Sequence, residues 1–471
     1  MKKLIAMLLA LMMVLCLCAC GGGGEAAGGG ETAQGLQVGF GRKLIMPEES
    51  VPMAGYTDSS KRMSAGFRDY LYATCIAFTE GGESVLMITQ DLFKSDENWT
   101  TQVRQRINAD TGIPAERIMI CATRNHAGPD ISSSLPSITA YKTLYIDALA
   151  AAAKEALEDR AAATLSTVTT QTEKLNFPRH YTLSDGSYGG DNFGDFTTTS
   201  ITGYANEGDP DMLLVKADRE GDKQDVLIVN WQVYPCKLGV ASDTNLSADF
   251  IGLVRTQVEK ETGMLCAYFT GAAGDLKPES KILEDKLNAS DEEYSQAIAR
   301  CAIDALPGLT PVEGQGVASA QVNFEYAMNH EDAHLLAQAK EVVATWNTAG
   351  LDAAKALAAQ QGFRSVYHAQ QVTLRASRPE KGTMELNVVK VGGIAFVAAP
   401  FEMFSQSGIA IRQASPFAAT VICECANEYQ GNFATLEAYD YHSYESDINP
   451  FARGCAEAAA EQFIEMLKSL Q

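Results

Sequence analysis

Polar side chains that could act as acids, bases or metal ligands lie directly after apolar, strand-like runs of this sequence. The residues in these positions are Asp91, Arg124 to Asp130, Tyr234 to Lys237, Asp275 and Glu402. In open α/β sheets, ligands bind just beyond the carboxyl ends of the strands. The pattern therefore predicts one site built from loops that are far apart in the sequence.

Carboxylates and histidines in this set allow more than one chemistry. Asp91, Asp249 and Asp275 could form a carboxylate cluster for Mg²⁺ or Ca²⁺. They could equally be helix caps and turn residues, which is the interpretation we favour. His330 and His334 have the i, i+4 spacing of metal ligands, but with no third ligand in view an exposed helix explains them better. Serine-hydrolase chemistry has little support, because the sequence contains no Gly-x-Ser-x-Gly elbow.

The elements that must position these residues alternate between strands and helices. Strands are predicted at 84–88, 118–122, 226–233, 265–270 and 421–425, with a hairpin over 389–399 that turns at Gly392-Gly393. Helices are predicted at 96–111, 140–160, 249–262, 291–305, 331–361 and 452–471. The Ala-rich segment 331–361 is predicted to be a helical insertion. The alternation predicts an α/β fold with mixed sheets and flanking helices.

The N-terminus has the pattern of a bacterial lipoprotein signal. Lys2 and Lys3 precede an apolar run that is too short to span a bilayer, and the run ends at Leu17-Cys18-Ala19-Cys20. We predict a signal peptide over 1–19 and lipidation of Cys20, which we prefer to Cys18 because Leu17 fits poorly before an acylated cysteine. An ordinary signal peptide cut nearby is the alternative. The Gly-rich segment 20–36 is predicted to be a flexible tether, so the protein is expected outside the cytoplasm, anchored to the cell membrane.

Composition limits the classes of partner. The chain of 471 residues is 46% hydrophobic, enough for a large core over 37–471, and its formal net charge is −22. Such a surface repels phosphate backbones, which argues against nucleic acid as a partner. Eight cysteines follow the signal, and some could form disulfides in an oxidising compartment. Cys423 and Cys425 are expected to face the same side of a strand.

Over residues 37–471 the sequence resembles the neutral, non-lysosomal ceramidase family. The motifs that carry this resemblance, in order, are Asp69-Tyr70-Leu71-Tyr72-Ala73, Thr89-Gln90-Asp91-Leu92, Asn176-Phe177-Pro178-Arg179-His180-Tyr181, Ser247-Ala248-Asp249-Phe250 and Gly271 to Pro278. Their order and spacing carry more weight than any single one. The resemblance implies a zinc amidase that acts on N-acyl, ceramide-like substrates, with the metal held by two His, one Glu and one Tyr.

Three of the four zinc ligands implied by the resemblance are replaced. The first His position is Arg124 in Arg124-Asn125-His126-Ala127-Gly128-Pro129, and the second is Tyr234. The Tyr position is Asn432, so only Glu402 is retained. An arginine cannot ligate a metal, and it could instead pair with Glu402 in the place of the cation. Zinc is thus the cofactor implied by the family, while the residues themselves favour none.

Other residues that the resemblance places in the active site are kept. His126 matches the second histidine of the family's motif, Arg179 its substrate-contacting arginine, and Tyr444 its tyrosine on the oxyanion side. Asp91 is placed in the substrate pocket with the replaced ligands. Three hypotheses follow: an amide hydrolase, a metal-free pseudoenzyme that binds a lipid or N-acyl ligand, and a surface interaction protein that keeps only the scaffold.

Overall fold

Nine strands of the described residues form one large mixed sheet, in the order β14-β12-β11-β6-β1-β3-β4-β5, with β16 paired to β6. Their bounds are β1 Gln37–Leu44, β3 Tyr72–Glu80, β4 Glu83–Gln90, β5 Ile118–Ala122, β6 Ala161–Gln171, β11 Asp211–Arg219, β12 Val226–Trp231, β14 Leu265–Thr270 and β16 Thr310–Pro311. Neighbouring strands are antiparallel except for the parallel pairs β4–β5 and β12–β14. The structure is a computed structural model that describes residues 35–471 without 57–58, 192, 194–195, 238–241 and 286–288. The predicted signal peptide, Cys20 and nearly all of the tether lie outside the described residues.

A second sheet packs against one face of the first. It has the order β17-β18-β19-β21, with bounds β17 Val317–Ala327, β18 Lys381–Val391, β19 Ile394–Ala398 and β21 Ala419–Cys423. The pair β19–β21 is parallel. Buried apolar side chains of both sheets form one cluster, in which the ring of Phe396 lies 5.8 Å from Phe78 and 6.4 Å from Phe269. The predicted hairpin is confirmed, and it turns at Gly392 with a φ of 57°.

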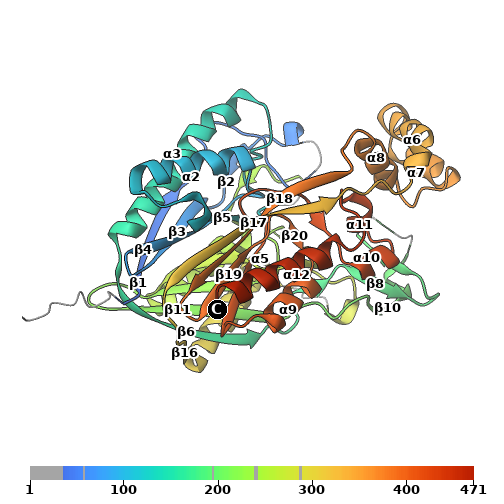
Figure 1. Cartoon of the computed structure of the whole chain (residues 1–471). Coiled ribbons are helices and arrows are strands. Elements are labelled where there is room, and N and C mark those ends of the chain that lie inside the picture. Colours follow the sequence, from blue (N-terminus) through green and yellow to red (C-terminus); the bar gives the residue numbers. More distant parts are fainter. Residues whose placement is uncertain (1–34, 57–58, 192, 194–195, 238–241, 286–288) are drawn as a thin grey trace, which may run out of the picture. The chain divides into compact units, whose positions relative to one another are not determined.

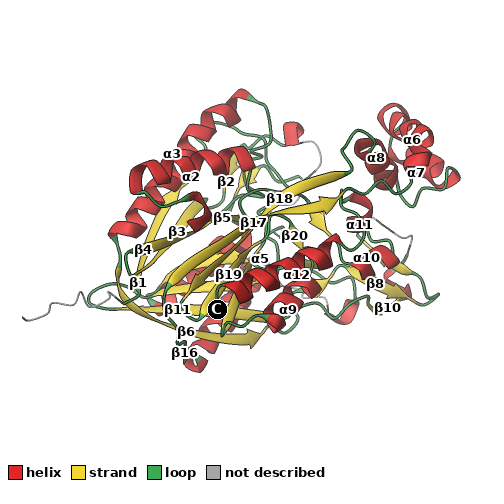
Figure 2. Ribbon diagram, viewed as in Figure 1, coloured by secondary structure: helices red, strands yellow, loops and turns green. Residues whose placement is uncertain are grey.

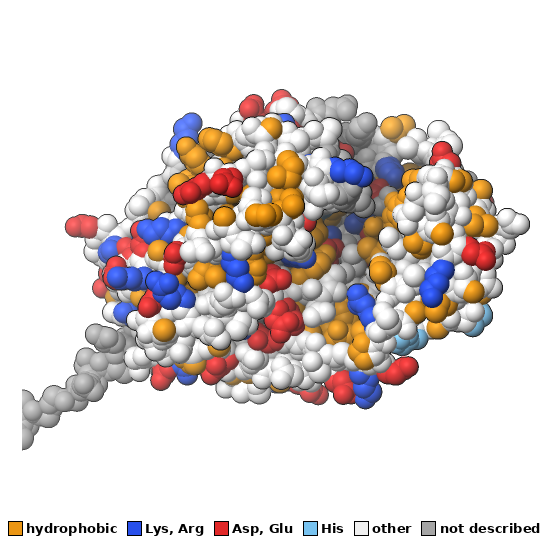
Figure 3. All heavy atoms as spheres, turned by 90° about the horizontal axis from the view of Figure 1, so that it is seen from above, with side chains coloured by type: hydrophobic (Ala, Val, Ile, Leu, Met, Phe, Trp, Pro, Cys, Tyr) orange, Lys and Arg blue, Asp and Glu red, His pale blue; other side chains and the backbone are white. Residues whose placement is uncertain are grey.

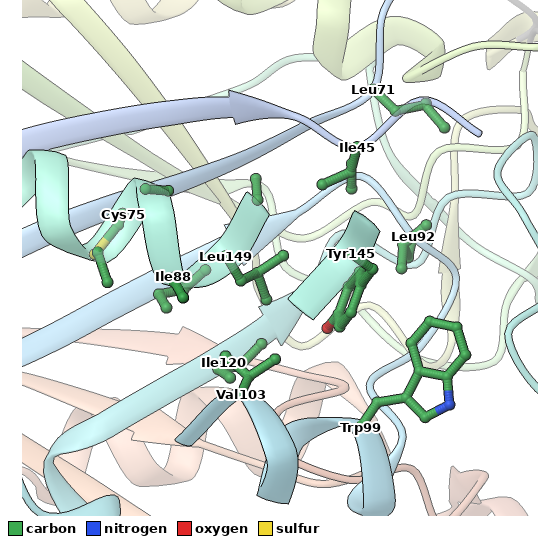
Figure 4. Packing of buried hydrophobic residues seen from close by; sticks show 14 of the residues in the cluster. Ile45, Leu71, Cys75, Ile88, Leu92, Trp99, Val103, Ile120, Tyr145 and Leu149 are labelled. Carbon is green, nitrogen blue, oxygen red and sulfur yellow. The ribbon is translucent and has the colours of Figure 1, made fainter. Parts of the chain in front are cut away.

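Helices cover the outer faces of both sheets (Figures 1 and 2). On the first sheet, α2 Glu97–Thr111 and α3 Pro136–Glu158 cover one half, where Trp99, Tyr145 and Leu149 pack with Ile88 and Ile120 (Figure 4). The other half is covered by α4 Asp249–Thr262 and α5 Asp291–Ala305. On the second sheet lie α9 Ser405–Ala414 and α12 Cys455–Ser469. The layers therefore run helix, sheet, sheet, helix, which confirms the predicted α/β class with mixed sheets.

Local signals in the sequence fix several helix ends. The carboxylate of Asp96 accepts a hydrogen bond of 3.0 Å from the Trp99 amide at the start of α2, and Gly112 ends this helix with a φ of 76°. Ser290 and Glu293 form a complete capping box at the start of α5. Such caps satisfy backbone groups that the helix leaves unpaired, which is why these bounds could be predicted within a residue or two.

Three helices form a small lobe with its own apolar core (right side of Figure 1). They are α6 Leu336–Ala349, α7 Leu351–Gln360 and α8 Val366–Arg375. The helical prediction for 331–361 is confirmed, but the segment forms two helices that are separated at Gly350, which has a φ of 89°. The third helix, α8, lies beyond the predicted segment. Ala and Val on α6 pack against Ala on α7 and Val on α8, so the lobe buries its apolar faces internally.

Short elements connect these layers near the candidate site. The short strands are β2 Gly66–Phe67, β7 Phe177–Pro178, β8 His180–Leu183, β9 Tyr188–Gly190, β10 Ile201–Tyr204, β13 Asn245–Leu246, β15 Leu276–Lys277, β20 Glu402–Met403 and β22 Asn432–Phe433. The short helices are η1 Ser59–Lys61, η2 Ala115–Arg117, η3 Thr198–Ser200, η4 Leu283–Asp285, η5 Leu306–Gly308, η6 Ala333–Leu335, α10 Leu436–Asp440 and α11 Tyr444–Ile448. In the part of the chain that the structure describes, no helix has both the length and the apolar character needed to cross a bilayer.

The eight described cysteines are all free thiols, so none of the disulfides considered from the sequence is formed among them. The predicted strand over 421–425 is instead β21 at Ala419–Cys423. Cys425 lies beyond its end with a φ of 52°, which corrects the expectation that Cys423 and Cys425 alternate along one strand.

Candidate active site

The predicted convergence of strand ends is confirmed around Arg124. Arg124 lies two residues beyond β5, Tyr234 follows β12, Glu402 follows β19 and Glu424 follows β21. Each of these strands belongs to a parallel pair, and the carboxyl ends of parallel neighbours meet at one edge of a sheet. Because the two sheets pack face to face, three such edges meet at one place.

The guanidinium of Arg124 is the centre of this cluster. It pairs with the carboxylate of Glu402, donates a 3.0 Å hydrogen bond to the carbonyl of Ala273, and lies 3.5 Å from the carboxyl group of Glu424. Its carbon Cζ lies 4.1 Å from the ring centroid of Tyr234, a cation–π contact. Arg124 is 3% exposed and has a φ of 64°, a backbone conformation that costs non-glycine residues about 1–3 kcal/mol. The contacts of the side chain therefore hold it in an unfavourable backbone conformation.

Two carboxyl groups share this one cation. Glu402 also accepts a hydrogen bond from the Tyr429 hydroxyl, and Glu424 accepts one of 3.2 Å from the Ala273 amide. Burial is the main cause that raises the pKa of Glu424 to about 8, against the opposing effect of Arg124. Burial lowers the pKa of Arg124, but Glu402 and Glu424 outweigh it and the net pKa is raised. At neutral pH the cluster is thus one ion pair, Arg124 with Glu402, beside a protonated Glu424.

His126 lies in a cage of aromatic rings beside this pair. Its ring centroid is 5.3 Å from Tyr56, 5.1 Å from Phe93 and 5.2 Å from Tyr234. Burial first, and then the positive charges of Arg124 and other arginines, lower its pKa well below the usual value of a histidine. The imidazole is therefore neutral at physiological pH.

The ring nitrogens of His126 are available to a ligand. Apart from the nearby Gly55 backbone, neither Nδ1 nor Nε2 has a hydrogen-bond partner among the described residues. A Cβ atom added to Gly55 would come within 2.5 Å of the imidazole, so only glycine allows this close approach. Buried polar atoms are rarely left unpaired, so these ring nitrogens have unused capacity to hydrogen-bond a ligand.

Arg179 anchors the other end of the site. Its guanidinium lies 2.9 Å from the carboxylate of Glu445 and 3.6 Å from that of Asp191. Glu445 also contacts His180, 2.7 Å away. Burial tends to raise the pKa of Glu445, but Arg179 and His180 lower it overall. The charge of Arg179 influences the titration of both His126 and Tyr234, so the two ends of the site are electrostatically connected.

The two remaining predicted residues lie on segments that join this group. Asn432 pairs with Glu402 between β20 and β22, and its buried Oδ1 has no hydrogen-bond partner among the described residues. Tyr444 begins α11, and its ring lies 5.1 Å from that of Tyr367 in the helical lobe. Burial raises the pKa of Tyr444, with Glu445 and Tyr367 adding to the effect, so its hydroxyl stays protonated and can donate.

Asp91 has a buried ion pair of its own. Both of its carboxylate oxygens contact Arg255, at 2.8 and 2.6 Å, and one also accepts from the Tyr72 amide. Asp275 accepts from the backbone and hydroxyl of Ser405, and Asp249 accepts from the Phe250 amide at the start of α4. These hydrogen bonds confirm the interpretation of the three aspartates as caps and structural partners.

The residues at the positions that the sequence resemblance assigns to zinc ligands are poorly suited to hold that ion. Arg124 only donates, and burial raises the pKa of Tyr234 so far that its phenol is not a phenolate ligand at neutral pH. Asn432 offers a neutral carbonyl, and Glu402 is already engaged by Arg124 and Tyr429. Among the described residues, no group of three or more His, Cys, Asp or Glu side chains is arranged to hold a metal ion.

Sequence reasoning missed three members of the site. Glu424 was assigned to the interior of a strand, although it is the first residue after β21. Tyr429 lies in a loop and Glu445 in the short helix α11, and neither position carries a periodic signal in the sequence. The rule of polar residues after strand ends could have found Glu424, but only the tertiary structure locates the other two.

Comparison with known proteins identifies the fold. No protein-family model and no curated protein matches the chain. Among solved structures, a neutral ceramidase from Pseudomonas aeruginosa aligns with a TM-score of 0.70 at 16% identity, covering 93% of this chain and 74% of its own. A structure described as ceramidase complexed with C2 aligns with a TM-score of 0.70 at 17% identity, covering 93% of this chain and 75% of its own. The chain therefore has a neutral-ceramidase-like fold, as the sequence motifs predicted.

Proposed function

We propose that this protein is an exported lipoprotein that binds an N-acyl ligand in a ceramidase-like pocket and does so without zinc. The observation that carries the proposal is the buried pairing of Arg124 with Glu402. An ion pair already satisfies the one carboxylate that the family would use as a metal ligand. A Zn²⁺ ion bound to Glu402 would lie against the positive charge of the Arg124 guanidinium. That guanidinium cannot move out of the buried site without leaving the Glu402 carboxylate unpaired.

The ligand class follows from the polar groups that remain around the pocket. His126 offers neutral ring nitrogens, the Tyr444 hydroxyl is a donor, and Arg179 adds a positive charge. An amide presents one N–H donor and one carbonyl acceptor, which His126 and Tyr444 can match. The solved structures of similar fold are ceramidases, and this supports an N-acyl group as the part of the ligand that the pocket recognises.

Export and anchoring rest on the N-terminal sequence. The charged start, the short apolar run and Cys20 have the order of a lipoprotein signal, and the Gly-rich segment after it suits a tether. In this proposal the cell membrane is the partner that holds the protein, and the ligand comes from the extracytoplasmic side.

A second candidate is an amide hydrolase that works without zinc. This candidate is favoured by the neutral imidazole of His126, which can accept a proton from water. The imidazole lies close enough to Arg124 for that positive charge to affect its pKa. Slow cleavage of an N-acyl amide that is lost in His126→Gln, and not affected by chelators, would favour this candidate over a binding protein.

Metal content and ligand binding test the proposal on residues 35–471, which form one compact unit with all the apolar clusters. We expect less than about 0.1 zinc per chain by mass spectrometry, even after added Zn²⁺. Titration calorimetry with N-decanoylglycinamide should give binding that weakens about tenfold in Tyr444→Phe, the loss of one buried hydrogen bond. The control Tyr70→Phe removes a hydroxyl from a half-exposed side chain outside this group. One tightly held zinc per chain, or equal binding by both variants, would contradict the proposal.

A further inference from the structure

A cavity of about 650 Å³ lies between the helical lobe and a wall that includes Phe193, Phe196 and Lys281. Its lining includes Phe196, Lys281, Lys355, Phe363, Arg364 and Tyr367. In Figure 3, a hollow with apolar side chains on its walls lies beside the lobe on the right. The volume is in the range of small-molecule sites in proteins, and the residues assigned to the ceramidase-like pocket do not line it.

The charge of the lining is opposite to that of the chain. The whole sequence has 59 acidic and 37 basic residues, yet the described lining of this cavity has three basic residues, Lys281, Lys355 and Arg364, and no acidic one. Lys281 contacts Asp191 at 2.9 Å and Arg364 contacts Asp447 at 2.8 Å. Lys355 forms no ion pair with any described residue, so its charge is available to a ligand. The lining is therefore complementary to an anionic group.

Apolar side chains supply part of the lining, beside its polar groups. Leu351 on α7 is 36% exposed, and Phe363 and Val366 present buried side chains between α7 and α8. Phe196 forms the opposite wall, with the ammonium of Lys281 5.1 Å from its ring centroid. Apolar walls with a few basic groups suit a molecule that has one apolar chain and one negative charge.

The cavity borders the Arg179 end of the candidate site. Tyr367 lines the cavity and packs at 5.1 Å against Tyr444. Lys281, on the other wall, contacts Asp191, whose carboxylate lies 3.6 Å from Arg179. A ligand in the cavity would thus lie against Tyr367, which contacts Tyr444, one of the two residues proposed to bind the amide.

We propose that this cavity binds the acyl chain and the anionic group of a single-chain anionic amphiphile, such as an N-acylated amino acid. The inference rests on the proposed function, because it names the class of N-acyl ligand that the pocket takes. Lys355 is the residue that selects for the negative charge, and Leu351 is one that selects for the chain.

Titration calorimetry on residues 35–471 tests this with three probes below their micellar concentrations. N-Decanoylglycine carries chain, amide and carboxylate, N-decanoylglycinamide lacks the charge, and N-acetylglycine lacks the chain. We expect the acid to bind at least about tenfold more tightly than the neutral amide. N-Acetylglycine should bind at least about a hundredfold more weakly than N-decanoylglycine, since each buried methylene is worth about fourfold in affinity.

Two variants and a matched control test whether the preferences for the carboxylate and for the acyl chain arise in this cavity. Lys355→Gln should weaken N-decanoylglycine about fivefold and leave N-decanoylglycinamide unchanged. Leu351→Gln should weaken both. Lys340→Gln removes an exposed charge from the same lobe, outside the cavity lining, and should change neither. Equal affinity for acid and amide, or wild-type binding of the acid by Lys355→Gln, would overturn the inference.

Tyr444→Phe separates this inference from the proposed function. Weaker binding of both decanoyl probes in Tyr444→Phe, together with no preference for the acid, would keep the proposed function and overturn the anionic cavity. An effect of Lys355→Gln without one of Tyr444→Phe would support the cavity and contradict the amide-binding role of Tyr444.

Discussion

Replacing Arg124 by alanine should destabilise the protein strongly and in a way that depends on pH. The change leaves Glu402, which is 2% exposed, without its cation, and removes the hydrogen bond to Ala273 and the contact with Tyr234. Breaking one side of a buried ion pair costs about 3–5 kcal/mol, because the remaining charge has no solvent to stabilise it. The other two contacts overlap with this figure and should not be added to it. We therefore expect a loss of about 3–5 kcal/mol in the free energy of unfolding at pH 8.

Protonation of Glu402 at lower pH should restore part of the free energy of unfolding that Arg124→Ala loses. In Arg124→Ala the buried carboxyl group of Glu402 has lost the cation beside it, so the folded protein favours its protonated form. A group of that kind contributes stability below its unfolded pKa, and this stability is lost as pH rises through the folded pKa. The deficit relative to the wild type should therefore be smaller at pH 5 than at pH 8.

Urea unfolding of residues 35–471, followed by circular dichroism at both pH values, measures this difference. Arg106→Ala is the matched control, because the ion pairs of Arg106 with Asp110 and Asp147 are exposed and contribute little to stability. A loss in Arg124→Ala no larger than that of Arg106→Ala would refute the reasoning. So would a deficit that grows as the pH falls.

Three further predictions concern the same site and the N-terminus. The pKa of Glu424, about 8, lies above its value in the unfolded chain. As the pH rises from about 5 to about 8, the free energy of unfolding of the wild type should therefore fall relative to that of Glu424→Gln. A difference between the two proteins that stays constant across this pH range would contradict the prediction. The triple variant Arg124→His, Tyr234→His and Asn432→Tyr restores the ligand types that the family resemblance implies beside Glu402, so it should bind about one zinc per chain by mass spectrometry, and the absence of zinc would show that the loops no longer have the required geometry. In the full-length chain expressed in a bacterium, Cys20→Ala should abolish labelling by a radioactive fatty acid, whereas labelling that persists would identify another anchor.

The sequence predicted the elements whose ends carry local signals. Helices near 96–111, 249–262 and 291–305 have caps or sharp changes of pattern, and the structure places α2, α4 and α5 there. Strands β5 and β14 were predicted with their observed bounds, because they are short apolar runs between polar loops. Buried central strands of this kind are uniformly apolar, so their limits can be read directly.

Long antiparallel strands were harder to predict. Strands β6 and β17 contain many Ala, Ser, Thr and Gln residues and alternate between half-buried and exposed positions. Their pairing with β11 and β18 is non-local, and it supplies the backbone hydrogen bonds that make them strands. No pattern within either segment indicates which partner it will meet.

Sequence alone determined which chemical groups are available to the candidate site, namely Arg124, Glu402, His126, Arg179 and Tyr444. Tertiary structure decided how these groups are paired and charged. Only the packing of the two sheets brings Glu424 to Arg124, and only burial among them makes Glu424 neutral and the imidazole of His126 uncharged. The physical reason is that a side chain's identity is local, whereas its solvation and its charged neighbours depend on segments hundreds of residues apart.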